Sequence, residues 1–346
     1  MTKYIINIDY LKIYNIGGVF ENKKHLSFKR EKYSSRHFKF IDQVYLYDQH
    51  IGTLESDPFS SVLKKNASMF KVENKWLYSK ELKYVLGNFY EITGAKINNI
   101  SRLDIAIDLQ SFERGYLPGT LIRHYLQEKI VKKGRVKFTV MGNEKNVKEF
   151  SYLRFGTRAS DVVTYLYNKS EEMEEVKHKS YISQHWEANG FDNNKNTWRL
   201  EFSLSSKANY FIDQGSGEIS NITLDNILDS TFIVKVAKGL IDKYFRFSIP
   251  EDKVRKTRMR DIELIDIGTA KIERINIKEG IDATRSDKIL MKNMYRLSKP
   301  HSSVNHSANL GAKTVLEWMK QTMYMRDFFE RKRRDWDEEF RILDEF

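Results

Sequence analysis

Two segments of the chain place charged side chains on one face of a predicted β-strand. Successive side chains of a strand point to opposite faces. Residues 102–108 (Arg-Leu-Asp-Ile-Ala-Ile-Asp) and 198–204 (Trp-Arg-Leu-Glu-Phe-Ser-Leu) therefore each have an apolar face, which predicts a core, and a polar face. The polar faces carry two arginines and three carboxylates, Arg102, Asp104, Asp108, Arg199 and Glu201.

A third segment adds tyrosines to this chemistry. In residues 162–169, alternation places Tyr165, Tyr167 and Lys169 on a common face, with Leu166 behind them. A tyrosine hydroxyl can attack the phosphorus of a phosphodiester and hold the DNA end covalently. Nearby cations can hold phosphate oxygens or favour the tyrosinate. If the three strands are neighbours in one sheet, their polar faces form a single surface.

Three carboxylates on such a surface predict a metal site. Carboxylates that converge repel one another unless a cation lies between them. Oxygen ligands suit Mg²⁺ or Mn²⁺, which would polarise a scissile phosphate, so Asp104, Asp108 and Glu201 are the predicted ligands. The competing interpretation is that these side chains only solvate the exposed face of a strand and that the tyrosines pack.

The composition favours a polyanionic partner. The 346 residues carry 59 Lys and Arg against 47 Asp and Glu, a formal net charge of +12, which suits nucleic acid. The absence of cysteine excludes disulfides, thiolate catalysis and cysteine zinc sites. No apolar run reaches 18 residues and the first ten residues lack a signal-peptide pattern, so we expect no membrane segment and a cytoplasmic location.

Hydrophobic periodicity predicts the elements that position these residues. The expected strands are Tyr4 to Tyr14, Phe38 to Tyr47, Met69 to Tyr78, Ser101 to Leu109, Tyr152 to Thr157, Val162 to Asn168 and Thr197 to Leu204. The expected helices are Lys80 to Tyr90, Pro118 to Lys133 and Leu224 to Phe247. This order predicts an α+β fold in which a central antiparallel sheet has its active site on one face and helices on the other.

The second half of the chain predicts a separate region. Residues 1–250 are the expected catalytic nicking domain, and residues 251–346 are an expected basic, mainly helical C-terminal region. Residues 298–309 are polar and contain a proline, which is typical of a linker. Thr314 and Glu317 then form a capping-box pattern that predicts the start of a helix.

Four ordered motifs resemble those of the replication initiation factor (Rep_trans) family, which includes rolling-circle plasmid initiators and relaxases of some integrative conjugative elements. The resemblance covers about residues 100–205. The motifs are Ser101-Arg-Leu-Asp-Ile-Ala-Ile-Asp108, Phe155-Gly-Thr-Arg-Ala-Ser160, Tyr167-Asn-Lys169 and Trp198-Arg-Leu-Glu-Phe-Ser-Leu204. It implies a nick at a replication origin that leaves a 5′-phosphotyrosyl link and a free 3′-hydroxyl primer.

The resemblance also assigns roles to residues. It implies that Tyr167 is the nucleophile, and it carries the family's acidic positions over to Asp104, Asp108 and Glu201. Lys169, Arg102 and Arg199 are expected to assist catalysis because of their placement on the polar faces. The residues expected to contact DNA are Tyr165, Arg154, Arg158 and Ser160. The chain departs from the family pattern at Tyr165, where a basic residue is usual, and at Ser203, where an acid is usual. The expected partners are duplex and single-stranded origin DNA, a host helicase and a second copy of the chain.

Three functions remain open from the sequence. The first is a rolling-circle initiator that cuts DNA with a tyrosine, or a relaxase of a conjugative element with the same chemistry. The second is an origin-binding initiator that does not cut. The third is a protein-interaction factor whose charge is incidental. Carboxylates that face phosphate favour the first, because a protein that only binds DNA gains nothing from them.

Overall fold

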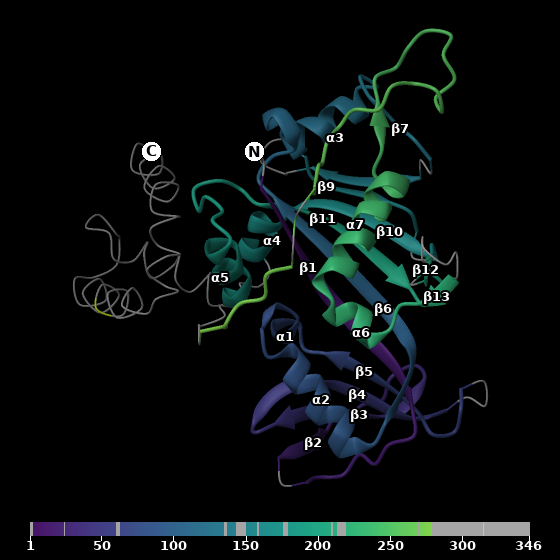
Figure 1. Cartoon of the computed structure of the whole chain (residues 1–346), viewed down its shortest axis with the longest axis vertical. Helices are drawn as coiled ribbons and strands as arrows, with labels where there is room; N and C mark the ends of the chain where they lie inside the picture. The colour runs from purple at the N-terminus through teal and green to yellow at the C-terminus, as the bar shows by residue number, and fades with distance from the viewer. Residues whose placement is uncertain are drawn as a thin grey trace, which may run out of the picture. The chain divides into compact units, whose positions relative to one another are not determined.

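The computed structural model describes residues 3–23, 25–59, 63–134, 137–142, 150–157, 159–175, 179–208, 210–212, 219–268, 270, 272–278 and 314. The chain divides into two compact units (Figure 1). The first contains residues 1–168 and 197–276, and the second contains residues 169–196 and 277–346. The expected boundary at residue 250 stays a prediction, and the expected linker at 298–309 lies outside the described residues.

A ten-stranded antiparallel sheet dominates the described part of the first unit. Its strand order is β2-β3-β4-β5-β1-β6-β11-β10-β9-β8, and every neighbouring pair is antiparallel. The predicted α+β fold with a central antiparallel sheet is confirmed. The strands are β1 (Tyr4–Ile16), β2 (Leu26–Arg30), β3 (Phe38–Leu46), β4 (Gln49–Pro58), β5 (Ala67–Val72), β6 (Lys96–Leu109), β8 (Phe138–Gly142), β9 (Phe150–Phe155), β10 (Val162–Asn168) and β11 (Trp198–Ser205).

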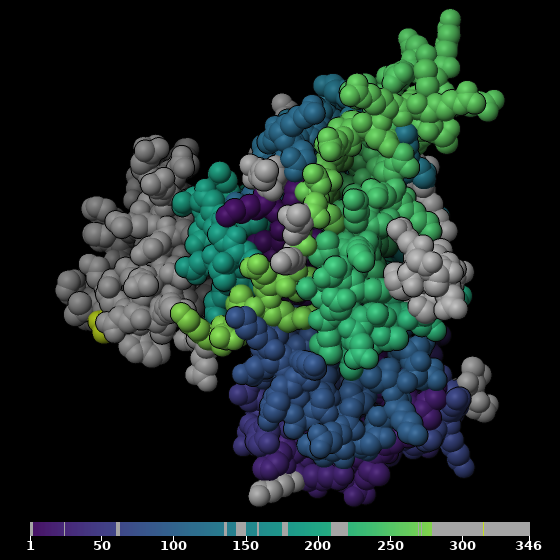
Figure 2. All heavy atoms as spheres, in the orientation of Figure 1, coloured from purple at the N-terminus to yellow at the C-terminus, as the bar shows by residue number. Residues whose placement is uncertain are grey.

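Shorter elements complete the two units. The first unit also contains two small antiparallel pairs, β7 (Val131–Lys132) with β14 (Phe247–Ser248), and β12 (Tyr210–Ile212) with β13 (Ile219–Asn221). Its helices are α1 (Asn74–Tyr78), α2 (Leu82–Thr93), the 3₁₀ turn η1 (Glu113–Gly115), α3 (Pro118–Leu126), α6 (Leu224–Leu228) and α7 (Ser230–Tyr244). The second unit contains α4 (Lys169–Glu175) and α5 (Ser180–Ala188). Residues 249–260, which follow β14, stand out from the surface of the first unit (Figures 1 and 2).

The core lies on the apolar face that strand alternation predicted. Leu103, Ile105 and Ile107 of β6 are completely buried. Leu200, Phe202 and Leu204 of β11 are buried in the same way, whereas Trp198 is partly exposed. Helix α7 turns its apolar stripe inward, and Figure 1 shows α6 and α7 lying over the strands around β6, β10 and β11. Apolar burial therefore fixes the polar face as the other side of these strands.

Several expected elements have different bounds. The strand expected to reach Tyr78 ends at Val72, and α1 begins at Asn74. The helix expected at 118–133 ends at Leu126. Glu128 then has a positive φ of 59°, which a helix interior does not allow. The long helix expected at 224–247 is two helices, because Asp229 accepts a hydrogen bond from the Thr231 N–H and caps α7.

Strands β2 and β4 and helix α5 were not predicted. Strands β3 and β4 are joined by Tyr47 and Asp48, both with positive φ (49° and 63°). Two-residue hairpin turns of this kind usually contain glycine or asparagine, which makes them recognisable in a sequence. This turn has neither residue. Among the described residues, no helix is both long and apolar enough to cross a membrane.

Candidate active site

Strand register brings the three predicted polar segments together. Strand β6 pairs with β11, and β11 pairs with β10, so the three strands are neighbours as expected. Two rows of residues cross them side by side. The first row is Asp108, Arg199 and Tyr167, and the second is Ala106, Glu201 and Tyr165. Ala106 keeps the centre of this surface low between longer side chains.

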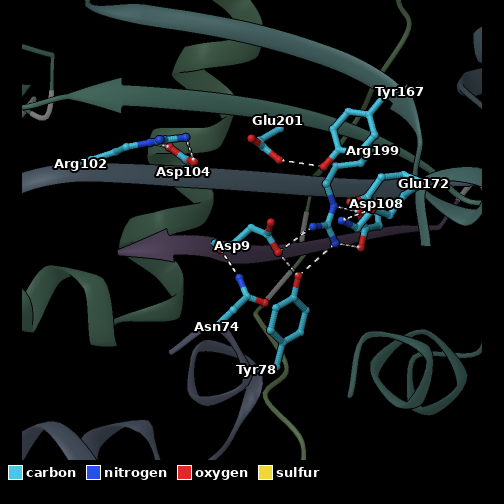
Figure 3. A network of polar contacts seen from close by, with 11 residues as sticks. Asp9, Asn74, Tyr78, Arg102, Asp104, Asp108, Tyr167, Glu172, Arg199 and Glu201 are labelled. Atoms are coloured by element: carbon cyan, nitrogen blue, oxygen red, sulfur yellow. Dashed lines mark hydrogen bonds and ion pairs between the residues drawn. The ribbon is translucent and has the colours of Figure 1, made fainter. Parts of the chain in front are cut away.

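Tyr167 makes the contact that matters most for chemistry. Its hydroxyl donates a hydrogen bond to Glu201 Oε2 at 2.9 Å (Figure 3). Both residues are half-buried, so neither side chain is fully sealed from solvent. A carboxylate at this distance is within reach to accept a proton from the phenol.

Beside this pair lies a completely buried arginine. Arg199 donates from Nε and Nη2 to the two carboxylate oxygens of Asp108, at 2.6 and 2.8 Å. Its Nη1 forms an ion pair of 2.6 Å with Asp9 Oδ1, outside hydrogen-bond geometry. Burial alone would lower the pKa of Arg199, but the charges of Asp108 and Asp9 raise it well above its usual value. Arg199 therefore stays charged and is held by two carboxylates.

Tyr78 of α1 closes this buried network. Its hydroxyl donates to Asp9 Oδ1 at 2.5 Å and accepts from Arg199 Nη2 at 3.0 Å. Burial raises the pKa of Tyr78 well above its usual range, so the phenol remains a donor. The side chain of Asn74, also in α1, donates to the main-chain carbonyl of Asp9. Helix α1 thus ties β1 to the arginine on β11.

Sequence reasoning missed Asp9 and Tyr78 as members of the site. Asp9 had a signal, because it is the one acidic residue in the strand Tyr4–Ile16, which is rich in isoleucine and tyrosine. It also lies at an irregularity of register between Ile8 and Tyr10. Tyr78 had no signal, because it was expected to lie in a strand rather than at the end of α1.

A second arginine–aspartate pair lies on the same face of β6. Arg102 donates from Nε and Nη2 to the two oxygens of Asp104, at 2.9 and 2.6 Å. The Arg102 side chain is 44% exposed and stacks over the Tyr10 ring at 4.4 Å, whereas the Asp104 side chain is 3% exposed. Burial raises the pKa of Asp104, and the hydrogen bonds and charge of Arg102 offset this only in part.

The predicted metal ligands do not gather around one point. Residues rise ~3.3 Å each along a strand, so Asp104 and Asp108 stand roughly 13 Å apart along β6. An arginine already binds both oxygens of each aspartate. Among the described residues, no group of three or more His, Asp or Glu side chains is placed to hold a metal ion. Asp104, Asp108 and Glu201 therefore do not fit one shared ion, and the requirement for Mg²⁺ or Mn²⁺ stays a prediction.

Two of the expected DNA-contacting residues lie beside Tyr167. Tyr165 is half-buried, and its ring lies 6.3 Å from that of Tyr152 on β9. Burial raises the pKa of Tyr165, and the charge of Glu201 adds to this effect. Arg154 pairs with Tyr165 across the strands and donates to the Thr139 hydroxyl at 2.9 Å. This end of the polar face thus combines aromatic rings with a cation.

The remaining expected residues have other places. The hydroxyl of Ser160 accepts a hydrogen bond from the Thr157 N–H at 3.0 Å, so it holds the turn between β9 and β10. Arg158 lies outside the described residues. Lys169 begins α4 in the second unit, where its ammonium group lies 2.7 Å from Glu172. The DNA-binding and catalytic roles of these residues stay predictions.

Comparison with known proteins gives one similar structure to report. It is the rolling circle replication initiator protein from Geobacillus stearothermophilus, 13% identical, with a TM-score of 0.48. The match covers 79% of this chain and 99% of that one. No family model and no curated protein matches the chain. At this identity and TM-score the match identifies no residue of the site, so the function is argued from the geometry of the site itself.

Proposed function

We propose that this chain initiates rolling-circle replication by nicking origin DNA with Tyr167. The observation that carries the proposal is the 2.9 Å hydrogen bond from the Tyr167 hydroxyl to Glu201 on the neighbouring strand. A nucleophile bonded to a carboxylate base is the minimum constellation for covalent attack on a phosphodiester. The surplus of positive charge, +12 over the chain, suits a nucleic-acid substrate.

The chemical step balances with these two residues and water. Glu201 takes the phenolic proton as the Tyr167 oxygen attacks phosphorus. A bond forms between the tyrosine oxygen and phosphorus, and the bond from phosphorus to the 3′ oxygen breaks. The departing 3′ oxygen takes a proton from water. The products are a 5′-phosphotyrosyl link and a 3′-hydroxyl that can prime synthesis.

The two arginines take different parts in this proposal. Arg199 is completely buried and already paired with two aspartates, so it cannot reach a phosphate and serves to position the strand that carries Glu201. Arg102 is 44% exposed and keeps its stem over Tyr10, so its guanidinium is the cation that can contact phosphate oxygens. This face thus carries one inner arginine, Arg199, and one outer arginine, Arg102.

Tyr165 is assigned to binding rather than to attack. Its raised pKa, caused by burial and by the charge of Glu201, disfavours the tyrosinate. Its ring neighbours Tyr152 at 6.3 Å, and the faces of such rings are surfaces on which unpaired bases stack. Arg154 beside it supplies positive charge for the backbone of the same strand of DNA.

The test uses supercoiled plasmid that carries the cognate origin, in Mg²⁺ or Mn²⁺ and in EDTA. The wild-type protein should relax the plasmid and form a protein–DNA adduct that survives denaturant. Tyr167→Phe should abolish both, because phenylalanine has no attacking oxygen. Glu201→Gln should slow nicking by about 10²- to 10⁴-fold, the usual contribution of a general base.

The matched control is Tyr165→Phe, which removes a hydroxyl two residues away on the same face. It should keep the adduct and weaken binding of single-stranded DNA at most several-fold. Adduct formation by Tyr167→Phe at the wild-type rate would overturn the assignment of the nucleophile. DNA binding without any adduct from the wild-type protein would favour the origin-binding function instead. Full nicking activity in EDTA would contradict the predicted requirement for Mg²⁺ or Mn²⁺.

A further inference from the structure

A strongly basic loop lies apart from the nicking surface. Residues 249–260 connect β14 to the chain beyond it and form what we call the basic loop. They contain five cations against Glu251 and Asp252, and four of the five are exposed. Figures 1 and 2 show this loop standing out from the first unit beyond β7. The five cations are Lys253, Arg255, Lys256, Arg258 and Arg260.

The root of the basic loop is fixed in the core. Phe247 of β14 is completely buried, and its ring packs against Phe245, Tyr125 and Phe155 at 5.1, 5.9 and 6.1 Å. The Ile262 N–H donates to the Phe247 carbonyl at 2.8 Å, so the two ends of the loop are held together. An exposed loop with an anchored base presents its charges from a defined place.

The acid nearest the root is already used. Asp261 accepts hydrogen bonds from Ser248 at 3.0 Å and from Arg246 Nε at 2.9 Å, and it forms an ion pair with Lys133 at 2.6 Å. Burial opposes its charge, but these partners outweigh burial and lower the pKa of Asp261. Its negative charge is therefore neutralised by Lys133 and Arg246, and it does not balance the cations of the loop.

Like charges lie close together at the root of the basic loop. The pKa of Lys132 is lowered to about 8, first by burial and then by the charge of Lys256 in the basic loop. Lys132 also lies over the Phe155 ring at 4.7 Å, which places the ammonium group beside the aromatic cluster. Cations that repel one another in the free protein gain most from a polyanion that binds across them.

We propose that the basic loop binds the phosphate backbone of duplex DNA and so anchors the protein beside the site at which Tyr167 acts. Residues 249–260 contain no aromatic side chain on which unpaired bases could stack, whereas the nicking face has Tyr152 and Tyr165. Cations without stacking rings suit a duplex, whose bases are paired and whose charge is dense along the axis. The nicking face and the basic loop thus divide single-stranded and duplex DNA between them.

The experiment measures binding to a 30-base-pair duplex of random sequence and to one of its single strands over a series of salt concentrations. The test variant is Lys253→Gln/Arg255→Gln/Arg258→Gln/Arg260→Gln. Each phosphate contact contributes roughly 0.9 to the slope of log affinity against log salt. With four cations removed, the variant should therefore lose up to about 3.6 from the duplex slope and more than tenfold in duplex affinity. Nicking of a single-stranded origin oligonucleotide should stay within about twofold of wild type.

The matched control removes four exposed lysines from helices α2 and α7, Lys83→Gln/Lys235→Gln/Lys238→Gln/Lys243→Gln. It has the same change in net charge and should keep duplex binding within about threefold. Unchanged duplex binding by the test variant would overturn the proposal, and so would an equal loss on single strands. Equal losses of duplex affinity in the test and control variants would also overturn the proposal, because net charge alone would then explain the effect. Duplex binding can be measured even if the wild-type protein does not nick DNA. Failure of the proposed function can therefore be told apart from failure of this proposal.

Discussion

Two arginine–aspartate pairs on one sheet face have opposite surroundings. In the inner pair, Arg199 is completely buried and Asp108 is 2% exposed, and Asp9 and Tyr78 complete the contacts. In the outer pair, Arg102 is 44% exposed while Asp104 is 3% exposed. Both pairs are bidentate, and their aspartates stand four residues apart on β6. The two arginines differ in exposure because different residues pack over the two ends of the polar face.

The cover decides what each arginine can do. Helix α1 brings Tyr78 against the inner pair, so the Arg199 guanidinium is enclosed by Tyr78, Asp9 and Asp108. In the part of the chain that the structure describes, no helix side chain is bonded to Arg102, whose guanidinium lies over Tyr10 and reaches solvent. A buried pair specifies how strands and helix meet, while an exposed cation can bind a phosphate. In the proposed function the inner pair therefore supports the structure, and Arg102 of the outer pair binds phosphate.

The largest effect on stability is expected from Arg199→Met. The substitution leaves the carboxylates of Asp9 and Asp108 buried without their cation, and breaking a buried ion pair in this way costs about 3–5 kcal/mol. Urea denaturation followed by circular dichroism measures the free energy of unfolding. A loss below about 1 kcal/mol would mean that the inner pair is not the support described.

The matched controls are Arg102→Met and Arg30→Met. Arg30 binds both oxygens of Asp42 at 2.9 and 3.1 Å and has similar exposure, 52% against 3% for its aspartate, but it lies on β2 away from the site. Each control should cost less than Arg199→Met, about 1–2 kcal/mol, because its arginine is about half exposed and solvent reaches that side of the pair. Only Arg102→Met should also weaken DNA binding, which would separate the binding role from the structural one.

A smaller effect is expected from Tyr78→Phe. The change removes one hydroxyl that donates to Asp9 and accepts from Arg199, and it keeps the ring that packs in the core. We expect a loss of about 1–3 kcal/mol, the cost of leaving buried polar partners unsatisfied. Thermal unfolding compared with Tyr90→Phe gives the control, because the Tyr90 hydroxyl bonds only the neutral Asn15 amide. Equal losses in the two variants would contradict a special role for the charged network.

Much of the fold and half of the site followed from strand alternation. The apolar residues of 102–108 and 198–204 fix which side of each strand is buried, and this also fixes the side that carries Glu201. The meeting of β6, β11 and β10 was a condition that the sequence could state but not prove. Register supplies it, and with it the contact between Tyr167 and Glu201.

The sequence could not show how far apart the carboxylates lie, nor which residues from other elements pack over the polar face. Alternation treats Asp104 and Asp108 alike, and so it grouped both with Glu201 as ligands of one ion. A strand is too extended for aspartates four residues apart to share an ion. Nor could a local pattern show that Tyr78, more than a hundred residues before Arg199, would seal one end of the face. Long-range contacts of this kind depend on topology and leave no periodic trace.

The smallest expected effect is a pH dependence of the free energy of unfolding that arises from Asp104 of the outer pair. The variant Asp104→Asn tests it. Burial raises the pKa of Asp104 above its unfolded value, so the folded state holds this proton more tightly than the unfolded state does. The contribution of the protonated group to stability is full below the unfolded pKa and falls as pH rises through the folded pKa. Asparagine does not titrate, so the stability of the variant relative to wild type should improve between pH 3 and pH 6. A difference that is flat across this range, measured by urea denaturation at each pH, would mean that Arg102 compensates the buried carboxylate in full.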